Sequence, residues 1–207
     1  MMMGKPMSRF MNNTNGIMGL TLSQIGLFLA TGILLTAVFF LVFSNDWQRT
    51  AEIRSFSSSF SNLVEDMDNS FFAKTTRFQF PFKNYAYAVK LSTGYIVISA
   101  KGFWGSNLFV SERFLIPPWP RSSHQNWTTG EDLHEYLNTT CGHRGTKNDS
   151  ISSVNFTQLC QELNTTISFY ALHPLEIFIR EPVFLEKVTI FYNGEKKHDF
   201  LLVYQLI

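Results

Sequence analysis

The feature that most constrains this chain is a run of 27 residues without a charged side chain, from position 17 to position 43. A helix of ~20 residues is enough to cross ~30 Å of hydrocarbon, so this run is long enough to span a bilayer. A cleavable secretory signal has a shorter apolar core, of ~7–15 residues, and a clear cleavage site of small residues after it. We therefore predict an uncleaved transmembrane helix at residues 17–43; a buried helix of a soluble protein is the less favoured interpretation.

The charges on the two sides of this run predict its direction in the membrane. Lys5 and Arg9 precede it with no acidic residue beside them, whereas the charges that follow it are balanced: Asp46, Arg49, Glu52 and Arg54. The positive-inside rule then places residues 1–16 in the cytoplasm, as an N-terminal segment or leader. We expect a single-pass protein of the cell membrane whose C-terminal part is extracytoplasmic.

Five glycosylation sequons support the same direction. In each, an asparagine is followed two residues later by serine or threonine, which is the acceptor pattern of exposed loops in exported proteins. The five asparagines are Asn126, Asn138, Asn148, Asn155 and Asn164, and residues 121–170 contain no others. The alternative is a merely polar segment in which these matches have no role.

Beyond the run, a helical period continues as far as residue 74. Apolar side chains recur at steps of mostly three and four residues, and serines and acidic residues lie between them. The apolar positions are Trp47, Ile53, Phe56, Phe60, Leu63, Val64, Met67 and Phe71. Since no proline occurs between Leu20 and Lys74, we predict that residues 44–74 extend the apolar helix as an amphipathic one. The whole would measure about 55 residues, or ~80 Å at 1.5 Å per residue.

The remaining chain, residues 75–207, has the pattern of an antiparallel sheet. Alternation predicts strands at residues 77–82, 85–91, 95–100, 107–116, 183–192 and 199–206. Gly94 marks one tight hairpin, and Asn193 with Gly194 marks a second and firmer one. The predicted fold class is therefore α+β, with a long transmembrane plus amphipathic helix followed by an antiparallel β-rich extracytoplasmic domain.

A polar insertion interrupts this domain at residues 117–166. Two short helices are expected within it: one after a capping box of Thr128 and Glu131, and one around the apolar face that contains Leu159 and Leu163. At the start of the insertion, residues 117–120 read Pro-Pro-Trp-Pro. They are either an exposed binding edge or a strand end packed against the sheet.

Two cysteines, Cys141 and Cys160, lie in the insertion and are the only ones in the chain. Two are too few for a disulfide framework but sufficient for one bridge in an oxidising compartment. A bridge would close a 20-residue loop and contribute ~3 kcal/mol in the chain-entropy model. We therefore treat the pair as a candidate disulfide.

The order of these elements resembles type IV pilins and their relatives, archaeal pilin-like and pseudopilin-like membrane proteins in particular. The residues Gly19, Leu20, Thr21, Leu22, Ser23 and Gln24 are similar to the prepilin processing site. The resemblance implies cleavage between Gly19 and Leu20 on the cytoplasmic side and retention of the apolar helix. It also implies a structural role, in which this helix packs with the helices of other subunits.

The chain departs from that family at two positions. Gln24 stands where many bacterial pilins have a glutamate that helps the subunit join its neighbour, and a neutral amide cannot form that ion pair. Met18 stands where archaeal prepilins often have a basic residue. Gln24 is therefore either an assembly contact or a polar residue near the cytoplasmic interface. Gly26 and Gly32 either allow another helix to approach closely or are simply tolerated small residues.

Several function classes are disfavoured by composition and motif. Lysine and arginine number 17 against 16 acidic residues, so the chain has no net basic field for nucleic acid. No phosphate-binding loop, serine elbow or paired-histidine zinc helix occurs, and we expect no catalytic residue, metal or cofactor. The nearest metal-ligand cluster is Asp132, His134, Cys141, His143 and Cys160, whose spacing fits no standard zinc pattern.

The leading hypothesis from sequence is thus a non-enzymatic, pilin-like structural or assembly subunit. Its expected partners are the lipid bilayer and other membrane subunits, which it would contact through the N-terminal helix. The alternative is a monomeric, membrane-tethered extracellular binding domain. An anchored hydrolase or metal protein is a third and weaker hypothesis, because it depends on the histidine and cysteine cluster alone.

Overall fold

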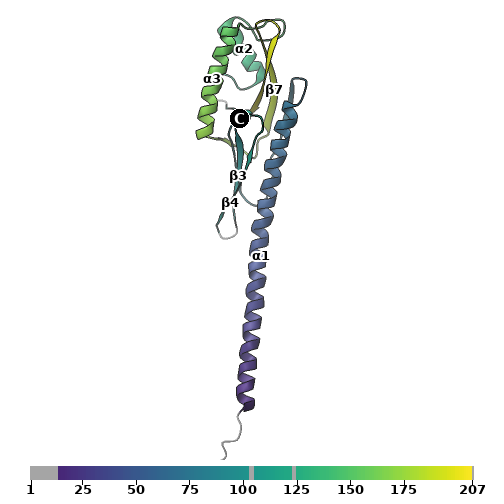
Figure 1. Cartoon of the computed structure of the whole chain (residues 1–207), viewed down its shortest axis with the longest axis vertical. Coiled ribbons are helices and arrows are strands. Elements are labelled where there is room, and N and C mark those ends of the chain that lie inside the picture. Colours follow the sequence, from purple (N-terminus) through teal and green to yellow (C-terminus); the bar gives the residue numbers. More distant parts are fainter. Residues whose placement is uncertain (1–13, 103–104, 123–124, 207) are drawn as a thin grey trace, which may run out of the picture. The chain divides into compact units, whose positions relative to one another are not determined.

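A computed structural model describes residues 14–102, 105–122 and 125–206, with the side chains of residues 14–20 and 42 left out. The described residues form an α+β fold, in which a long apolar helix, α1 (Thr14–Asp68), is followed by sheets that are mainly antiparallel (Figure 1). This confirms the α+β class and the predicted order of a long apolar helix followed by a mainly antiparallel β-rich part. The chain divides into two compact units, residues 1–45 and 46–207, and each is described by itself below.

In the first unit, α1 presents apolar side chains on all of its faces. Every described side chain from residue 21 to residue 43 is exposed. The hydroxyls of Thr31 and Thr36 donate to the carbonyls of Leu27 and Gly32, at 2.6 and 2.7 Å. Within the described residues, α1 is the one helix that is long and apolar enough to cross a membrane. Because α1 begins at Thr14, the last three residues of the predicted leader, 14–16, are helical. Residues 1–13 lie outside the described residues.

In the second unit, α1 buries one stripe of side chains against the sheets. The stripe contains Ile53, Phe60, Val64 and Met67, as the period predicted, but also Ser57 and Ser61, which were predicted to face solvent. Positions 53, 57, 60, 64 and 67 follow the helical period, so the serines lie within the packed face. Small side chains there allow the helix to lie close to the strands.

The prediction of the amphipathic face was wrong at both of its ends. Trp47 and Phe71 are 77% and 94% exposed. The helix ends at Asp68 rather than at residue 74, because the ammonium group of Lys187 binds the carbonyls of Asp68 and Ser70 and draws the chain into a turn. Carbonyls at a helix C-terminus lack intrahelical partners, and this lysine satisfies one of them.

Two four-stranded sheets follow, with orders β1-β7-β8-β5 and β4-β3-β2-β6. The strands are β1 (Lys74–Phe78), β2 (Tyr87–Leu91), β3 (Tyr95–Lys101), β4 (Asn107–Arg113), β5 (Trp119–Arg121), β6 (Leu175–Ile177), β7 (Val183–Tyr192) and β8 (Lys196–Tyr204). Of the paired strands in the described chain, only β5 and β8 run parallel. The six predicted strands are present, β7 with the predicted bounds and the other five with shifted ends, whereas β5 and β6 were not predicted as strands.

The hairpin of β7 and β8 forms the centre of the second unit. Asn193 and Gly194 have φ angles of 47° and 86°, the left-handed values that a tight turn between β7 and β8 requires, as the dipeptide predicted. Residues 200–204 of β8 are buried on both faces of the sheet. An unbroken apolar run is typical of a strand that is covered on both sides.

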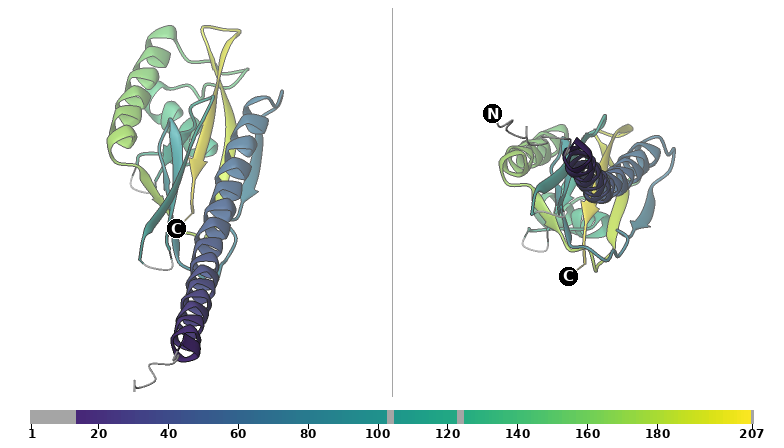
Figure 2. Two further views of the ribbon diagram at one scale, coloured as in Figure 1. Left: turned by 60° about the horizontal axis from the view of Figure 1, so that its bottom comes forward. Right: turned by 90° about the horizontal axis from the view of Figure 1, so that it is seen from below.

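Two hydrophobic cores lie on opposite faces of the β7–β8 hairpin. The first contains the buried face of α1 and residues of both sheets, including Val183 and Leu201. The second lies beneath α2 (Gly130–Cys141) and α3 (Ser153–Leu172) and includes Ile190 and Leu202. In Figure 2 the green helices and the blue part of α1 lie on either side of the yellow strands. The predicted insertion is therefore a packed layer, and its second helix is longer than predicted.

The start of α2 is capped one residue later than predicted. Thr129, not Thr128, is the N-cap: its hydroxyl accepts the N–H of Asp132, and the Asp132 carboxylate accepts the N–H of Thr129. These two bonds form a capping box, with an aspartate where the sequence suggested Glu131. Thr128 and Thr129 are equally suitable N-cap residues by sequence, and only the first residue of α2 in the structure distinguishes them.

Candidate functional site

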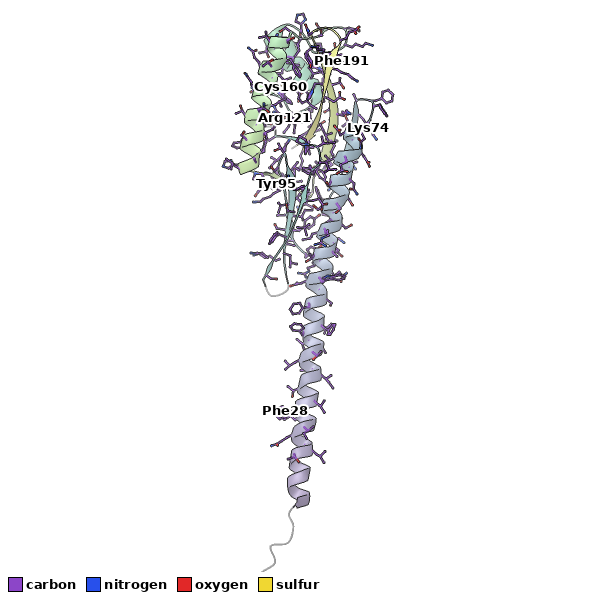
Figure 3. All side chains as sticks on the ribbon, viewed as in Figure 1. Phe28, Lys74, Tyr95, Arg121, Cys160 and Phe191 are labelled. Carbon is purple, nitrogen blue, oxygen red and sulfur yellow. The ribbon has the colours of Figure 1, made fainter. Side chains whose placement is uncertain are left out.

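The apolar surface of α1 in the first unit is the first candidate site. Gly26 and Ala30 are four residues apart and share one face, as do Gly32 and Thr36. A Cβ atom added at Gly26 or Gly32 would meet nothing within 4 Å. Around Gly32 the surface is hollowed between larger side chains, among them Phe28, which points outward (Figure 3). Close approach of another helix is therefore sterically open at both glycines.

The residues of the suggested processing site lie in the same helix. Gly19 and Leu20 are within α1, with their side chains outside the described residues. Gln24 is exposed one turn further on. Gly26 lies about 120° around the helix from Gly32, since each residue turns it by ~100°. The two glycines therefore lie on different faces of α1, and one neighbouring helix cannot pack closely against both.

All five sequons lie in the second unit: Asn126 precedes α2, and the other four lie on or between α2 and α3. Four of their asparagines are exposed, and Asn155 is half-buried. The expectation of loop positions was wrong for three: Asn138 lies in α2, and Asn155 and Asn164 lie in α3. Their threonines, at positions 140, 157 and 166, donate to the carbonyl four residues earlier, as helical threonines commonly do.

The cysteines are both free thiols, so the predicted disulfide is not formed in the structure. Cys141 is the last residue of α2, and Cys160 lies within α3 (Figure 3). Both are half-buried and pack against the second core. Burial raises the pKa of the Cys160 thiol above its ordinary value. The two helices are held by this core.

The Pro-Pro-Trp-Pro segment leads into β5, which supports the packed alternative over an exposed edge. Arg121, the last residue of β5, is buried, and its Nε and Nη2 donate to the carbonyl of Trp127 at 3.1 and 2.7 Å. Its guanidinium carbon lies 3.3 Å from the centroid of the Trp127 ring. Burial lowers the pKa of Arg121 to about 10, although Glu162 opposes this shift. The sequence analysis missed this anchor, because a single arginine carries no periodic signal.

The predicted metal-ligand cluster is dispersed among separate contacts. His134 Nδ1 lies 2.6 Å from the carbonyl oxygen of Arg144, and His143 Nδ1 lies 2.6 Å from Asp149 Oδ1. The backbone N–H of Arg144 and then His143 hold the pKa of the Asp149 carboxyl below its ordinary value. Within the described chain, no three histidine, cysteine, aspartate or glutamate side chains are grouped to hold a metal ion.

A polar groove of about 530 Å³ is the second candidate site. It lies over β7, between the residues that follow α1 and the start of α2, and its walls include the exposed Phe71 and Phe72. Charged side chains of both signs line it: Glu131, Glu186, Lys147, Lys187 and Lys197. Pockets of ~300–1,000 Å³ with a few convergent polar groups are typical of ligand sites.

The start of the second unit carries a third cluster, which ties α1 to the loop between β1 and β2. Glu52 accepts a hydrogen bond from Tyr85 Oη at 2.8 Å and lies 3.2 Å from the ammonium group of Lys83. The Arg49 guanidinium lies 5.1 Å from the centroid of the Tyr85 ring. Tyr85, followed by the weaker effect of Lys83, holds the pKa of the Glu52 carboxyl below its ordinary value. No motif predicted this cluster, whose members are distant in sequence.

Comparison with known proteins found no matching family model, no matching curated protein and no matching solved structure.

Proposed function

We propose that this chain is a single-pass, membrane-anchored structural subunit, pilin-like in its organisation and without enzymatic activity. The observation that carries the proposal is the composition of α1. This helix contains 27 uncharged residues, and those whose side chains are described are exposed. It then continues into the second unit, where a stripe of buried side chains completes the first core. A wholly apolar helix surface of this length needs lipid or other apolar helices around it.

Assembly with other subunits, in this proposal, uses the part of α1 that precedes residue 53. From Ile53 onward, the apolar stripe is already covered by the sheets of the same chain. Upstream, Gly26 and Gly32 provide close approach for neighbouring helices, and Gln24 provides a polar contact. Helices associate in lipid through small residues and interhelical hydrogen bonds, because no hydrophobic driving force acts between them.

The N-terminus is cytoplasmic and the second unit is extracytoplasmic in this proposal. Lys5 and Arg9 support that direction. Four exposed sequon asparagines on the α2–α3 layer are also consistent with it, since modification requires access.

Cysteine cross-linking in the native membrane tests the assembly surface. In a chain with Cys141→Ser and Cys160→Ser, we expect Gly26→Cys or Gly32→Cys to cross-link one copy to another subunit. Val38→Cys is the matched control, since at ~100° per residue it lies about 120° around the helix from both Gly26 and Gly32. N-terminal sequencing of the same material is expected to begin at Leu20. Absence of cross-links at both glycines, with an N-terminus upstream of Gly19, would reject the pilin-like proposal.

A second candidate function is that of a monomeric, membrane-tethered binding domain. The groove beside Phe71 and Phe72 favours it, because that groove combines exposed aromatic rings with charges of both signs. A strictly monomeric protein in mild detergent, with the N-terminal segment retained, would support this candidate. Mutation of Lys147 and Lys197 to glutamate would then be the first step in finding an acidic ligand.

A further inference from the structure

Three segments that are distant in sequence meet where the second unit begins. The Arg49 guanidinium, on α1, donates to the carbonyl of Lys101 at the end of β3, with an Nη1–O distance of 2.9 Å. Ser106 Oγ, just before β4, donates to Asp46 Oδ2 at 3.3 Å. The loop between β1 and β2 reaches the same region through the ion pair of Lys83 with Glu52.

Gly102, just after β3, lies close to the side-chain ends of Ser106 and Asp46. A Cβ atom added at Gly102 would lie 2.1 Å from Ser106 Oγ and 2.8 Å from Asp46 Oδ2. The N–H of Gly102 also donates to the Ser106 carbonyl, at 2.8 Å. The ends of β3 and β4 are therefore fixed beside the first turn of α1 that belongs to this unit (Figure 1).

This region carries exposed aromatic rings on the three segments that meet here. Trp47, Phe82 and Phe109 are 77%, 68% and 71% exposed. Arg49, Lys83 and Lys101 belong to the same segments and make contacts within the unit, and their side chains combine an apolar stem with a charged end. We call these six residues, Trp47, Arg49, Phe82, Lys83, Lys101 and Phe109, the base surface.

The position of the base surface along α1 identifies what it would meet. Asp46 follows the last residue of the uncharged run by three positions, a rise of ~5 Å along a helix. The headgroup layer on each side of a bilayer is about 5–8 Å deep beyond the hydrocarbon. A helix of 27 residues is ~40 Å long and crosses ~30 Å of hydrocarbon when it is tilted. With Phe43 at the edge of the hydrocarbon, Asp46 and the strand ends bound to it lie at the depth of the headgroups.

We propose that the base surface docks on the lipid headgroup layer of the membrane that the helix spans. This inference rests on the proposed membrane anchoring. Aromatic rings and basic side chains are the groups that proteins place at membrane interfaces, where a ring meets acyl chains and a cation meets phosphate. Docking through Trp47, Phe82 and Phe109 adds contacts on three separate segments to the single helix and thereby fixes the orientation of the second unit on the membrane.

Quenching by lipid-attached nitroxides tests the proposal on the full chain. The protein carries Cys141→Ser and Cys160→Ser and sits in nanodiscs of phosphatidylcholine and phosphatidylglycerol. An environment-sensitive fluorophore is attached in turn to Phe82→Cys and Phe109→Cys. Phe72→Cys is the matched control, because Phe72 is an equally exposed aromatic residue of the same unit. Ile33→Cys reports insertion of the helix itself.

The expected result is loss of emission from labels at 82 and 109 when the nitroxide lies near the headgroup, and from the label at 33 when the nitroxide lies deep in the acyl chains, with no loss at 72 in either case. Quenching at 33 without quenching at 82 and 109 would overturn the docking and leave the anchor intact. No quenching at 33 would overturn both. Cross-linking between copies through residue 109, without lipid quenching there, would assign the surface to a second copy and reject the lipid partner.

A second variant tests the aromatic residues themselves. Trp47→Ser is expected to reduce the lipid quenching of a label at 109, whereas Phe72→Ser is expected to leave it unchanged. Both substituted residues are exposed, so neither change removes a core contact. Unchanged quenching in the Trp47→Ser variant would show that the ring does not hold the surface on the membrane.

Discussion

The two parts of α1 show how one helix sequence is adapted to two different surroundings. From residue 21 to residue 43 the side chains are apolar around the whole circumference and exposed wherever they are described. From residue 53 to residue 67 the helix buries a single stripe and keeps polar side chains elsewhere. The first pattern suits a solvent that is apolar on every side, and the second suits a helix with protein on one side and water on the other.

The two parts of α1 also differ in whether the hydroxyl groups named below have a hydrogen-bond partner. Thr31 and Thr36 satisfy their hydroxyls on the carbonyls of the preceding turn, which is the arrangement a hydrocarbon environment requires. In the second part, the buried Oγ of Ser57 has no hydrogen-bond partner among the described residues. Tight packing against the sheets therefore outweighs the cost of one unsatisfied hydroxyl in the core. The difference between the two parts of α1 leads to the following predictions.

The largest expected effect separates a buried from an exposed phenylalanine of α1. Phe60 is 1% exposed and touches the rings of Phe78, Phe80 and Phe114, so Phe60→Ala should lower the free energy of unfolding of the second unit by about 3–5 kcal/mol. Phe40→Ala, in the first part, should change it by less than about 0.5 kcal/mol. Urea unfolding in detergent, followed by tryptophan fluorescence, measures both. Equal effects would abolish the distinction between the two parts.

A charge in the first part should act on membrane insertion instead of folding. Ile33→Asp places a carboxylate near the centre of the apolar run and should disfavour insertion by about 2.5–3.5 kcal/mol. The membrane-integrated fraction after synthesis with microsomes measures this loss. Phe72→Asp, at an exposed site of the second unit, is the control and should insert normally. Normal insertion of both variants would contradict a transmembrane assignment.

Acid should weaken the second unit and spare the first part of α1. The backbone N–H of Thr129 holds the pKa of Asp132 below its ordinary 3.8, and the pKa of Glu52 is also lowered. Their stabilisation is present above the ordinary pKa and is lost as pH falls through the lowered one. Residues 17–43 contain no titratable group. Thermal unfolding between pH 7 and pH 2 should show a falling midpoint with residual helix, and Asp132→Asn should reduce the dependence on pH.

The smallest expected effect has the opposite sign. Ser57→Ala removes a buried hydroxyl without a partner and improves helix propensity, so it should stabilise the second unit by about 1 kcal/mol. Thr36→Ala, in the first part, should leave that unit unchanged. The same urea unfolding experiment applies. A loss of stability in the Ser57→Ala variant would mean that the hydroxyl has a partner, such as a bound water.

Much of the fold could be predicted because its signals are local. The uncharged run lies within α1, and β7 occupies the predicted residues 183–192, since alternation and the Asn-Gly turn are both encoded in neighbouring residues. β5 and β6 were missed because each has three residues, too few to establish a period. The end of α1 was misplaced because it depends on Lys187, a residue more than a hundred positions away.

The candidate sites divide in the same way. Gly26 and Gly32 could be recognised as small residues in an apolar helix, although only the structure shows that a Cβ atom at either position would meet nothing within 4 Å. The base surface could not be predicted, because Arg49, Lys83 and Lys101 belong to three segments that the fold brings together. The same holds for Arg121, whose burial depends on the stacking of Trp127.

The most direct test of the account is a spin-label scan along α1 in nanodiscs, with accessibility to oxygen and to a water-soluble nickel complex measured at each position. The account predicts oxygen access on all faces from residue 22 to residue 41. From residue 53 to residue 67 it predicts a 3.6-residue period of nickel access, with minima at Ile53, Phe60, Val64 and Met67. Nickel access throughout residues 22–41 would contradict the assignment of lipid as the solvent of the first part.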